Sequence, residues 1–247
     1  MGFSGKPRGV TDNTPSDSSL PPSLAYLVGD AEVVAVWLNE LGGLTFRVGA
    51  DRYLKWSPAG SGLPLADEAA RLHWASSYAT VPRVLDAGAT DDGDWLLTEA
   101  LDGENAVSER WRRDPRTAAR AIGEGLRRLH EALPVDGCPF DWSVADRVGR
   151  MGDPSLHLSS EPSIDKLVVC HGDACAPNTL IDDHGRFRGH VDLGRLGVAD
   201  RLADLAVATY SLGWNYGDGF EGDLLDAYGI EADAERTTFY RALWDAT

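Results

Sequence analysis

The residues best suited to chemistry lie in the stretch 168–197, where a histidine, two aspartates and an asparagine follow runs of apolar residues. His171, Asp173 and Asn178 share one short loop, and Asp192 opens the triplet D-L-G after a later β-rich run. The carboxylate of Asp173 can accept the proton of an attacking hydroxyl. Asn178 and Asp192 can supply the hard oxygen ligands that Mg²⁺ takes when it neutralises nucleotide phosphates. These residue types predict transfer of a phosphoryl group from a nucleotide to a hydroxyl.

The spacing of these residues is more specific than their types, because H-x-D-x-x-x-x-N followed by D-x-G is the pattern of a kinase catalytic loop and its metal-binding triplet. Two alternatives stay open. Asp and Asn are ordinary turn residues, so the segment can be a plain strand–turn–strand unit, although that does not explain the combined spacing. A metal-dependent hydrolase can also use an H-x-D pair, but the other histidines show no metal-ligand spacing. The strands expected around the loop are 167–170, 179–182 and 187–191.

The N-terminal third predicts a small antiparallel sheet with one helix. Lys55 lies on the third expected strand, where a kinase lysine reaches the α- and β-phosphates of the nucleotide. Helical spacing of apolar residues predicts a helix over 65–78, and Glu68 in its first turn is placed to pair with Lys55. A lone lysine on a strand and a glutamate near a helix start are also ordinary features. Glycine-containing turns separate the first three β-rich runs, at 32–39, 44–48 and 52–56.

Two glycines, Gly42 and Gly43, connect the first two runs and are the candidates for a loop that covers the phosphates. Because neither carries a side chain, their backbone N–H groups can approach a phosphate closely. The same pair would serve in a plain hairpin turn, and no G-x-G-x-x-G occurs in the chain. The two glycines are therefore expected either to bind phosphate or to form an ordinary hairpin turn.

The composition and net charge of the chain indicate which classes of ligand it can bind. The net charge of −16 over 247 residues disfavours nucleic acids and anionic membranes and favours a cationic ligand. A hydrophobic content of 43% and a mean hydropathy of −0.25 are typical of a soluble globular protein. The sequence shows no membrane-length apolar run and no signal peptide, and its three cysteines suggest no disulfide framework, so a cytoplasmic location is expected. Residues 1–22 are expected to form a mobile tail, and no oligomeric state is predicted.

The stretches VVCHGDACAPNTLID and VDLGRLGVADRLADLAVA resemble the corresponding parts of bacterial aminoglycoside 3'-phosphotransferases. The resemblance is dense over 167–207 and thinner from about residue 33 onward. It implies a two-lobed, protein-kinase-like α+β fold that holds ATP (or GTP) and Mg²⁺ between the lobes and phosphorylates a hydroxyl of an aminoglycoside antibiotic. The expected lobes are a nucleotide-binding sheet lobe with one helix at 23–99, and a larger, mostly helical lobe with the catalytic loop and the acceptor site at 100–247.

The same resemblance suggests further site residues. Thr98 and Ala100 lie at the family's hinge, where backbone groups bind adenine, and Asp204 corresponds to a tether for the catalytic segment. In the C-terminal stretch FYRALWDAT, Asp245 aligns with an acidic position of the acceptor site, whereas Trp244 stands where another acidic residue is usual. The segment 141–165 is short for the family, and it offers further carboxylates at Asp146, Asp153, Glu161 and Asp165.

Two further helices are expected. One covers 115–132, with an N-cap aspartate and a proline at its start, and His130 near its end is expected to be structural. The other covers 200–210, and Trp214 and Tyr216 follow it beside several carboxylates. Exposed aromatic rings in such a setting can bind a sugar or an amine, or they can cover the helical core.

Two other functions remain open. The chain could be a kinase of another small hydroxylated metabolite on the same fold, or a non-catalytic protein that binds a nucleotide or an antibiotic. A protein substrate is disfavoured, because no activation loop ending in A-P-E follows Asp192. The complete set of Lys55, Asp173, Asn178 and Asp192 favours an enzyme over a binding protein.

Overall fold

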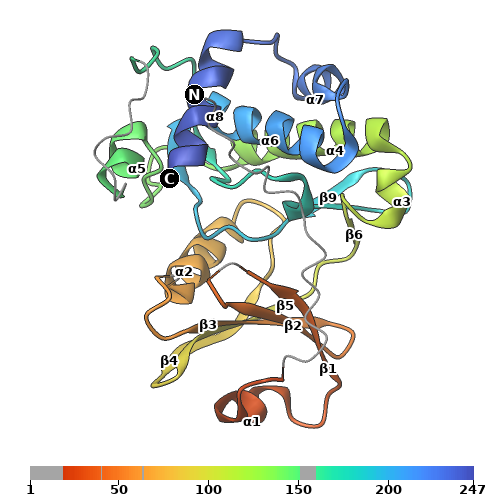
Figure 1. The fold of residues 1–247 in the computed structure, drawn as a ribbon, viewed down its shortest axis with the longest axis vertical. Coiled ribbons are helices and arrows are strands. Elements are labelled where there is room, and N and C mark those ends of the chain that lie inside the picture. Colours follow the sequence, from red (N-terminus) through yellow and green to blue (C-terminus); the bar gives the residue numbers. More distant parts are fainter. Residues whose placement is uncertain (1–18, 40, 63, 151–159) are drawn as a thin grey trace, which may run out of the picture. The chain divides into compact units, whose positions relative to one another are not determined.

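The computed structural model describes residues 19–39, 41–62, 64–150 and 160–247 (Figure 1). These residues form two compact units, one that ends at Leu101 and one that begins at Asp102. The predicted α+β class, with a small antiparallel sheet and a larger, mostly helical part, is confirmed. Residues 1–18 of the expected N-terminal tail lie outside the described residues. None of the described helices combines the length and the apolar composition that crossing a bilayer requires.

The unit that ends at Leu101 is built on a five-stranded antiparallel sheet of order β1-β2-β3-β5-β4. Apolar side chains alternate along its strands, as Leu44, Phe46 and Val48 do, and so face one side of the sheet. On that side they pack with Leu24 and Val28 from the short helices η1 (Pro22–Leu24) and α1 (Ala25–Val28). The strands are β1 Val33–Leu38, β2 Leu44–Val48, β3 Arg52–Pro58, β4 Val84–Thr90 and β5 Gly93–Glu99.

Helix α2, Leu65–Ala75, contacts β3, β4 and β5. It carries the predicted Glu68, and it ends three residues earlier than the predicted 65–78 because the chain continues as a turn after Ser76. Lys55 of β3 alternates with the buried Leu54, so its side chain leaves the sheet on the other face from the core described above.

The unit that begins at Asp102 is mostly helical. Helix α4, Pro115–Ala132, has the predicted bounds: Asp114 Oδ1 accepts from the N–H of Thr117 at 3.3 Å, and proline fits the first helical position. Gly123 lets α4 approach α7 closely, since a Cβ there would lie 2.2 Å from the carbonyl oxygen of Leu224. The other helices are α3 Glu109–Arg112, α5 Val144–Arg150, η2 Ala176–Asn178, α6 Arg201–Tyr216, α7 Glu221–Tyr228 and α8 Ala234–Ala246.

Two small sheets frame the predicted catalytic loop. Strand β7, Leu167–Cys170, pairs with β10, Gly197–Asp200, and a second sheet has the order β6-β8-β9. These strands confirm the predicted runs around the loop, and β10 was not predicted. The three strands of the second sheet are β6 Glu104–Asn105, β8 Thr179–Ile181 and β9 Phe187–His190.

Helix α6 corrects the prediction of a helix over 200–210. Asp200 is its N-cap and accepts from the N–H of Leu202 at 3.1 Å, but the helix continues to Tyr216. Gly213 does not interrupt it, whereas Gly217, with a φ of 86°, ends it. Trp214 and Tyr216 therefore belong to the last turn of α6 rather than to a loop after it.

Candidate active site

The loop that follows β7 is held at its start by a buried carboxylate. Asp204 of α6 accepts from the backbone N–H of His171 at 2.6 Å and from that of Gly172 at 2.9 Å. His130 of α4 approaches the same carboxylate, with Nε2 3.0 Å from Oδ2. Burial alone would raise the pKa of Asp204, but the hydrogen bond with His130, the nearby His171 and the N–H of Gly172 outweigh burial and hold that pKa below its usual value. Asp204 is therefore an ionised acceptor with a complete set of donors.

His171 links the loop to the D-L-G triplet. Its Nε2 lies 3.0 Å from the carbonyl oxygen of Val191, and its Nδ1 lies 3.3 Å from the backbone nitrogen of Asp173. Because a carbonyl only accepts and an N–H only donates, the imidazole carries its proton on Nε2 and is neutral. The N–H of Val191 in turn donates to the carbonyl oxygen of Asn178 at 3.0 Å. Both backbone groups of the residue before Asp192 are thus fixed by the loop.

Asp173 and Asn178 are brought together by the loop itself. Asn178 donates its Nδ2–H to the backbone carbonyl of Asp173 at 2.9 Å, which leaves Oδ1 as the side-chain oxygen for another ligand. Asp173 is half-buried, and its Oδ1 is buried without a hydrogen-bond partner among the described residues. A buried carboxylate oxygen in this state is suited to accept a hydrogen bond from a hydroxyl.

Backbone conformation marks two positions of the site. Gly172 has a φ of 85°, and a Cβ there would lie 2.1 Å from the carbonyl oxygen of Arg195, so only glycine fits this position of the loop. Asp192 has a φ of 64° and is the only non-glycine residue with a positive φ among those described. Its side chain is exposed. Such a conformation persists only where the surroundings enforce it, and here the hydrogen bonds to Val191 do so.

The predicted pair in the other unit is present. Lys55 Nζ lies 2.7 Å from Glu68 Oε1 and 2.9 Å from Oε2. Glu68 is only 6% exposed, whereas Lys55 is half-buried, so the ammonium is the part of the pair that solvent or a ligand can approach. The antiparallel register of β3 places Lys55 opposite Thr45 and Leu96.

Gly42 and Gly43 form a hairpin turn around Asn39. The N–H of Gly42 donates to the carbonyl oxygen of Asn39 at 3.2 Å, and the N–H of Gly43 donates to Asn39 Oδ1 at 2.7 Å. Gly42 has a φ of 81°, which such a turn requires. Both amides are thus used inside the turn, and binding of a phosphate by them would require Asn39 to move.

The predicted hinge residues end strand β5. Thr98 is buried and pairs with Tyr53 of β3 and Val84 of β4. Ala100 donates its N–H to the carbonyl oxygen of Asp51 at 2.8 Å. Because this amide is occupied, recognition of adenine by Ala100 would use its carbonyl oxygen.

The sequence profile of the phosphotransferase enzyme family matches residues 37–151 and 156–240. The chain belongs to this family. An aminoglycoside 3'-phosphotransferase of Streptomyces fradiae is 38% identical over 220 residues, which are 76% of this chain and 81% of the relative. A second one, from Streptomyces ribosidificus, is 36% identical over 243 residues, or 83% of this chain and 91% of the relative.

Solved structures of this family share the fold. The aminoglycoside 3'-phosphotransferase of type VIII has a TM-score of 0.75 at 31% identity, over 91% of this chain and 97% of its own. APH(3'')-Id from Streptomyces rimosus has a TM-score of 0.71 at 32% identity, over 89% of this chain and 94% of its own. The predicted resemblance and protein-kinase-like fold are confirmed, and this chain is a phosphotransferase with an alcohol group as acceptor.

The residues predicted to bind the acceptor of this phosphotransferase differ in their surroundings. Tyr216 donates its hydroxyl proton to the carbonyl oxygen of Ala106 at 2.6 Å, and burial raises the pKa of this hydroxyl. The hydroxyl is therefore used in a hydrogen bond inside the protein. Trp214 is half-buried and lies between Tyr210 and Trp244, with ring centroids 4.3 and 5.5 Å away. Trp244 is buried, whereas the next residue, Asp245, is exposed.

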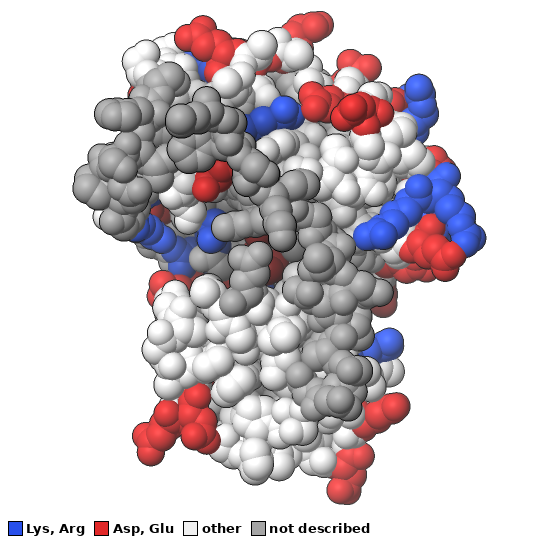
Figure 2. Space-filling view, in the orientation of Figure 1, with Lys and Arg blue, Asp and Glu red and all other residues white. Residues whose placement is uncertain are grey.

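Two carboxylates of the shortened segment form ion pairs in the described part of the phosphotransferase. Asp146 pairs with Arg150 in the next turn of α5, and Asp165 pairs with Arg201 at the start of α6. Glu161 is exposed, and Asp153 lies outside the described residues. Figure 2 shows acidic side chains on the visible face of both units, in line with the net charge of −16.

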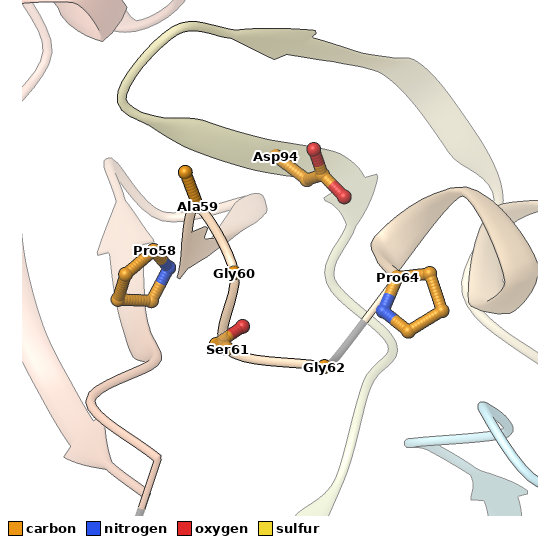
Figure 3. A pocket seen from close by; sticks show the side chains of 7 residues that line it. All are labelled: Pro58, Ala59, Gly60, Ser61, Gly62, Pro64 and Asp94. Atoms are coloured by element: carbon orange, nitrogen blue, oxygen red, sulfur yellow. The ribbon is translucent and has the colours of Figure 1, made fainter.

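One pocket of the phosphotransferase lies apart from the predicted residues (Figure 3). It is formed by the loop between β3 and α2, and Asp94 of β5 points into it. None of the predicted site residues lines it, so we assign it no part in the reaction. Its lining residues are Pro58, Ala59, Gly60, Ser61, Gly62, Pro64 and Asp94.

Sequence reasoning missed two supports of the predicted catalytic loop. His130 was expected to be structural, but its contact with Asp204 was not foreseen, and its Nδ1 also lies 2.8 Å from the hydroxyl of Tyr228. Ser211 of α6, which accepts from the N–H of Ala176 at 2.9 Å, was not singled out. The only available signal was the spacing of seven residues between Asp204 and Ser211, which places both on one helix face.

Proposed function

We propose that this phosphotransferase transfers the γ-phosphoryl group of ATP to a hydroxyl of an aminoglycoside or a closely similar cationic sugar. The observation that supports this most strongly is the Asp173–Asn178 loop, in which a carboxylate with a buried, unpartnered oxygen lies beside an asparagine whose Oδ1 is left for a ligand. GTP in place of ATP is a variant of the same proposal.

Asp173 is the proposed base. Its Oδ1 would accept the hydrogen bond of the acceptor hydroxyl and then its proton as the oxygen attacks phosphorus. The half-buried position limits competing water around this carboxylate. Asp204 accepts hydrogen bonds from the N–H groups at the start of the loop, and Asn178 donates one to the Asp173 carbonyl; together these bonds keep the base in place.

Asn178 and Asp192 are the proposed Mg²⁺ ligands. Their donor set fits, because one amide oxygen and one exposed carboxylate suit a hard cation that keeps several waters. Asn178 can offer only Oδ1, since its Nδ2 is held by Asp173. When bound there, Mg²⁺ neutralises charge on the nucleotide phosphates.

Lys55 is the proposed phosphate ligand of the sheet unit, in which Thr98 and Ala100 are the proposed adenine neighbours. Glu68 holds the Lys55 ammonium through both carboxylate oxygens and so limits its rotamers. We propose that residues 23–99 bind the nucleotide, and that residues 100–247 carry the base and bind the acceptor.

Three observations support a cationic acceptor. The net charge is −16, two relatives from Streptomyces are aminoglycoside 3'-phosphotransferases, and a second structure of APH(3'')-Id, with a TM-score of 0.68 at 30% identity, contains ADP and streptomycin. Trp214 and Asp245 are the proposed acceptor contacts. Tyr216 would contribute its ring, because its hydroxyl is occupied by Ala106.

A second candidate is phosphorylation of another small hydroxylated metabolite. The observation that favours it is Trp244, which is buried against Trp214 and offers no carboxylate to an amine. The test is release of nucleoside diphosphate from ATP and Mg²⁺ across a panel of aminoglycosides and neutral sugars, with Asp173→Ala as control. Release that needs both an aminoglycoside and Asp173 supports the first proposal, whereas release only with neutral sugars supports the second.

A further inference from the structure

Helix α6 contacts the catalytic segment at two places. Asp204 accepts from the N–H groups of His171 and Gly172, and Ser211 accepts from the N–H of Ala176 at 2.9 Å. Residues seven apart are separated by nearly two helical turns, so these two side chains lie on one face of α6, about 10 Å apart along its axis. The segment from His171 to Ala176 therefore follows the helix and is bonded to it at both ends.

Ser211 completes the 3₁₀ turn that carries Asn178. The turn η2 begins at Ala176, and the residue before it, Cys175, makes no side-chain cap bond. The hydroxyl of Ser211, from a different element, accepts instead from the first N–H of the turn. Ser211 and Ala176 are both 0% exposed, so water cannot replace the hydroxyl if it is removed.

Asn215 holds the Ser211 side chain in place from one turn further along α6. Its Nδ2 donates to the carbonyl oxygen of Ser211 at 2.8 Å and to Ser211 Oγ at 3.1 Å. Ser211 Oγ thus accepts from two donors and keeps its own proton for a third neighbour. Cys175 lies near this hydroxyl and near the carboxylate of Asp173, since both groups act on the pKa of its thiol.

The contact with Cys175 leads back to the proposed base. Burial raises the pKa of the Cys175 thiol well above its usual value, with Asp173 as the next cause. The sulfur therefore keeps its proton beside the carboxylate of Asp173. The hydrogen bonds that support the turn run from Asn215 to Ser211 and from the N–H of Ala176 to Ser211.

We propose that Ser211, oriented by Asn215, is a positioning residue for phosphoryl transfer. It fixes the turn η2, and through it the Oδ1 of Asn178 and the carboxylate of Asp173. The proposal rests on the proposed function for its kinetic readout, and on the hydrogen bonds above for its structural one. Displacement of catalytic groups by about 1 Å can cost about 10²-fold in rate, so one lost bond at this turn is expected to act mainly on kcat.

The test compares four variants. Ser211→Ala removes the hydroxyl, Ser211→Thr keeps it, and Asn215→Ala removes only the group that orients it. Thr209→Ala is the matched control, because Thr209 is also buried in α6 but its hydroxyl donates to carbonyl groups within the helix and accepts from Arg241 of α8. Each variant is measured for kcat, for the KM of acceptor and of ATP, for the Mg²⁺ concentration at half-maximal rate, and for amide hydrogen exchange of residues 172–181.

We expect Ser211→Ala to lower kcat by about 10- to 100-fold and to raise the Mg²⁺ requirement by about threefold or more, while the acceptor KM changes by less than about threefold. The Ala176 amide should exchange faster in this variant. Ser211→Thr should recover most of the activity. The kcat of Asn215→Ala should lie between those of Ser211→Thr and Ser211→Ala. Thr209→Ala should lose thermal stability but keep its kcat and Mg²⁺ dependence.

The opposite results overturn the proposal. They are a Ser211→Ala variant with wild-type kcat and Mg²⁺ dependence, or a Thr209→Ala control that loses as much activity as Ser211→Ala. If Ser211→Ala does not fold, Asn215→Ala provides the test of the positioning role. An unchanged kcat in Asn215→Ala then contradicts the proposal. If the wild type phosphorylates no acceptor, the proposed function fails separately, and unchanged exchange of the Ala176 amide in the Ser211→Ala or Asn215→Ala variant still overturns the positioning role.

Discussion

His171 donates its Nε2 proton to the carbonyl oxygen of Val191 at 3.0 Å, and so fixes the residue immediately before Asp192. The imidazole is fully buried, and its other nitrogen accepts from the N–H of Asp173. One neutral ring therefore joins the segment of the proposed base to the segment of a proposed metal ligand. In this structure both ring nitrogens of the histidine in the H-x-D pattern hydrogen-bond with backbone atoms.

Replacement of His171 should uncouple these two segments. We expect His171→Ala to lower kcat by about 10²-fold, because Asp192 loses the support of its strained backbone. His171→Gln should lose less, since its amide can still donate to Val191. The comparison of kcat and of unfolding in urea for the two variants, with the exposed His184→Gln as control, checks this, and a fully active His171→Ala would contradict it.

Asp173→Asn should remove general-base catalysis. The expected loss in kcat is about 10²- to 10⁴-fold, with ATP affinity little changed, because the amide cannot accept the hydroxyl proton. The control is Asp218→Asn, which changes an exposed carboxylate on another part of the chain. Steady-state rates of ADP release and calorimetric ATP binding provide the measurement, and normal turnover by Asp173→Asn would falsify the assignment.

Lys55 and Glu68 should behave as one unit. Lys55→Ala is expected to raise the KM for ATP by about tenfold or more and Glu68→Gln by less, because the glutamate acts through the lysine. In the double variant the effects should not add, with a coupling energy of about 0.5–3 kcal/mol. Initial rates over a range of ATP concentrations, measured for the wild type, both single variants and the double variant, give this double-mutant cycle. Additive effects, or an acceptor KM that rises as much as that of ATP, would speak against the pairing.

The His130–Asp204 contact should contribute to stability as well as to the site. Removal of one partner of a buried ionic hydrogen bond leaves the other without compensation, so His130→Ala is expected to destabilise the fold by about 3 kcal/mol. Tyr228→Phe removes only the hydroxyl that contacts the other nitrogen of His130 and should cost about 1 kcal/mol. Urea unfolding followed by circular dichroism measures both. Equal losses in the two variants would disagree with this ranking.

His190 should make the fold sensitive to mild acid. Burial, with the neighbouring His171 as the second cause, lowers the pKa of His190 to about 3 from 6.5. The unfolded chain therefore takes up a proton before the folded one, and the stability due to neutral His190 is complete above pH 6.5 and is lost as the pH falls from 6.5 towards 3. The expected slope is about 1.4 kcal/mol per pH unit between about pH 6 and about pH 4.

The variant His190→Gln isolates this effect. It cannot titrate, so its unfolding free energy should fall less steeply than that of the wild type as the pH decreases. The exposed His184→Gln should follow the wild type at every pH. Urea unfolding from about pH 7.5 to about pH 4.5 gives the comparison. A constant difference between wild type and His190→Gln over this range would show that His190 does not titrate on unfolding.

Local patterns were sufficient where the determining groups are close in sequence. Helix α4 has its predicted bounds because its N-cap aspartate and its first-turn proline stand beside its first residues. The same reasoning failed at the end of α6, where an exposed Gly213 is tolerated inside the helix and the stop comes at Gly217. It also left Gly42 and Gly43 undecided, because only the structure shows that Asn39 occupies their amides.

The sequence by itself determined the reaction class, because one loop and one pair of short strands fix the offsets of Asp173, Asn178 and Asp192 locally. Lys55 and Glu68 likewise lie on a strand and a helix of regular period. Only the tertiary structure decided what holds these groups. Asp204 meets His130 across 74 residues of chain, and Ser211 meets Ala176 across 35. Such contacts depend on how buried helix faces pack against one another, and the spacing of residues along one helix shows which side chains share a face but not which partner that face meets.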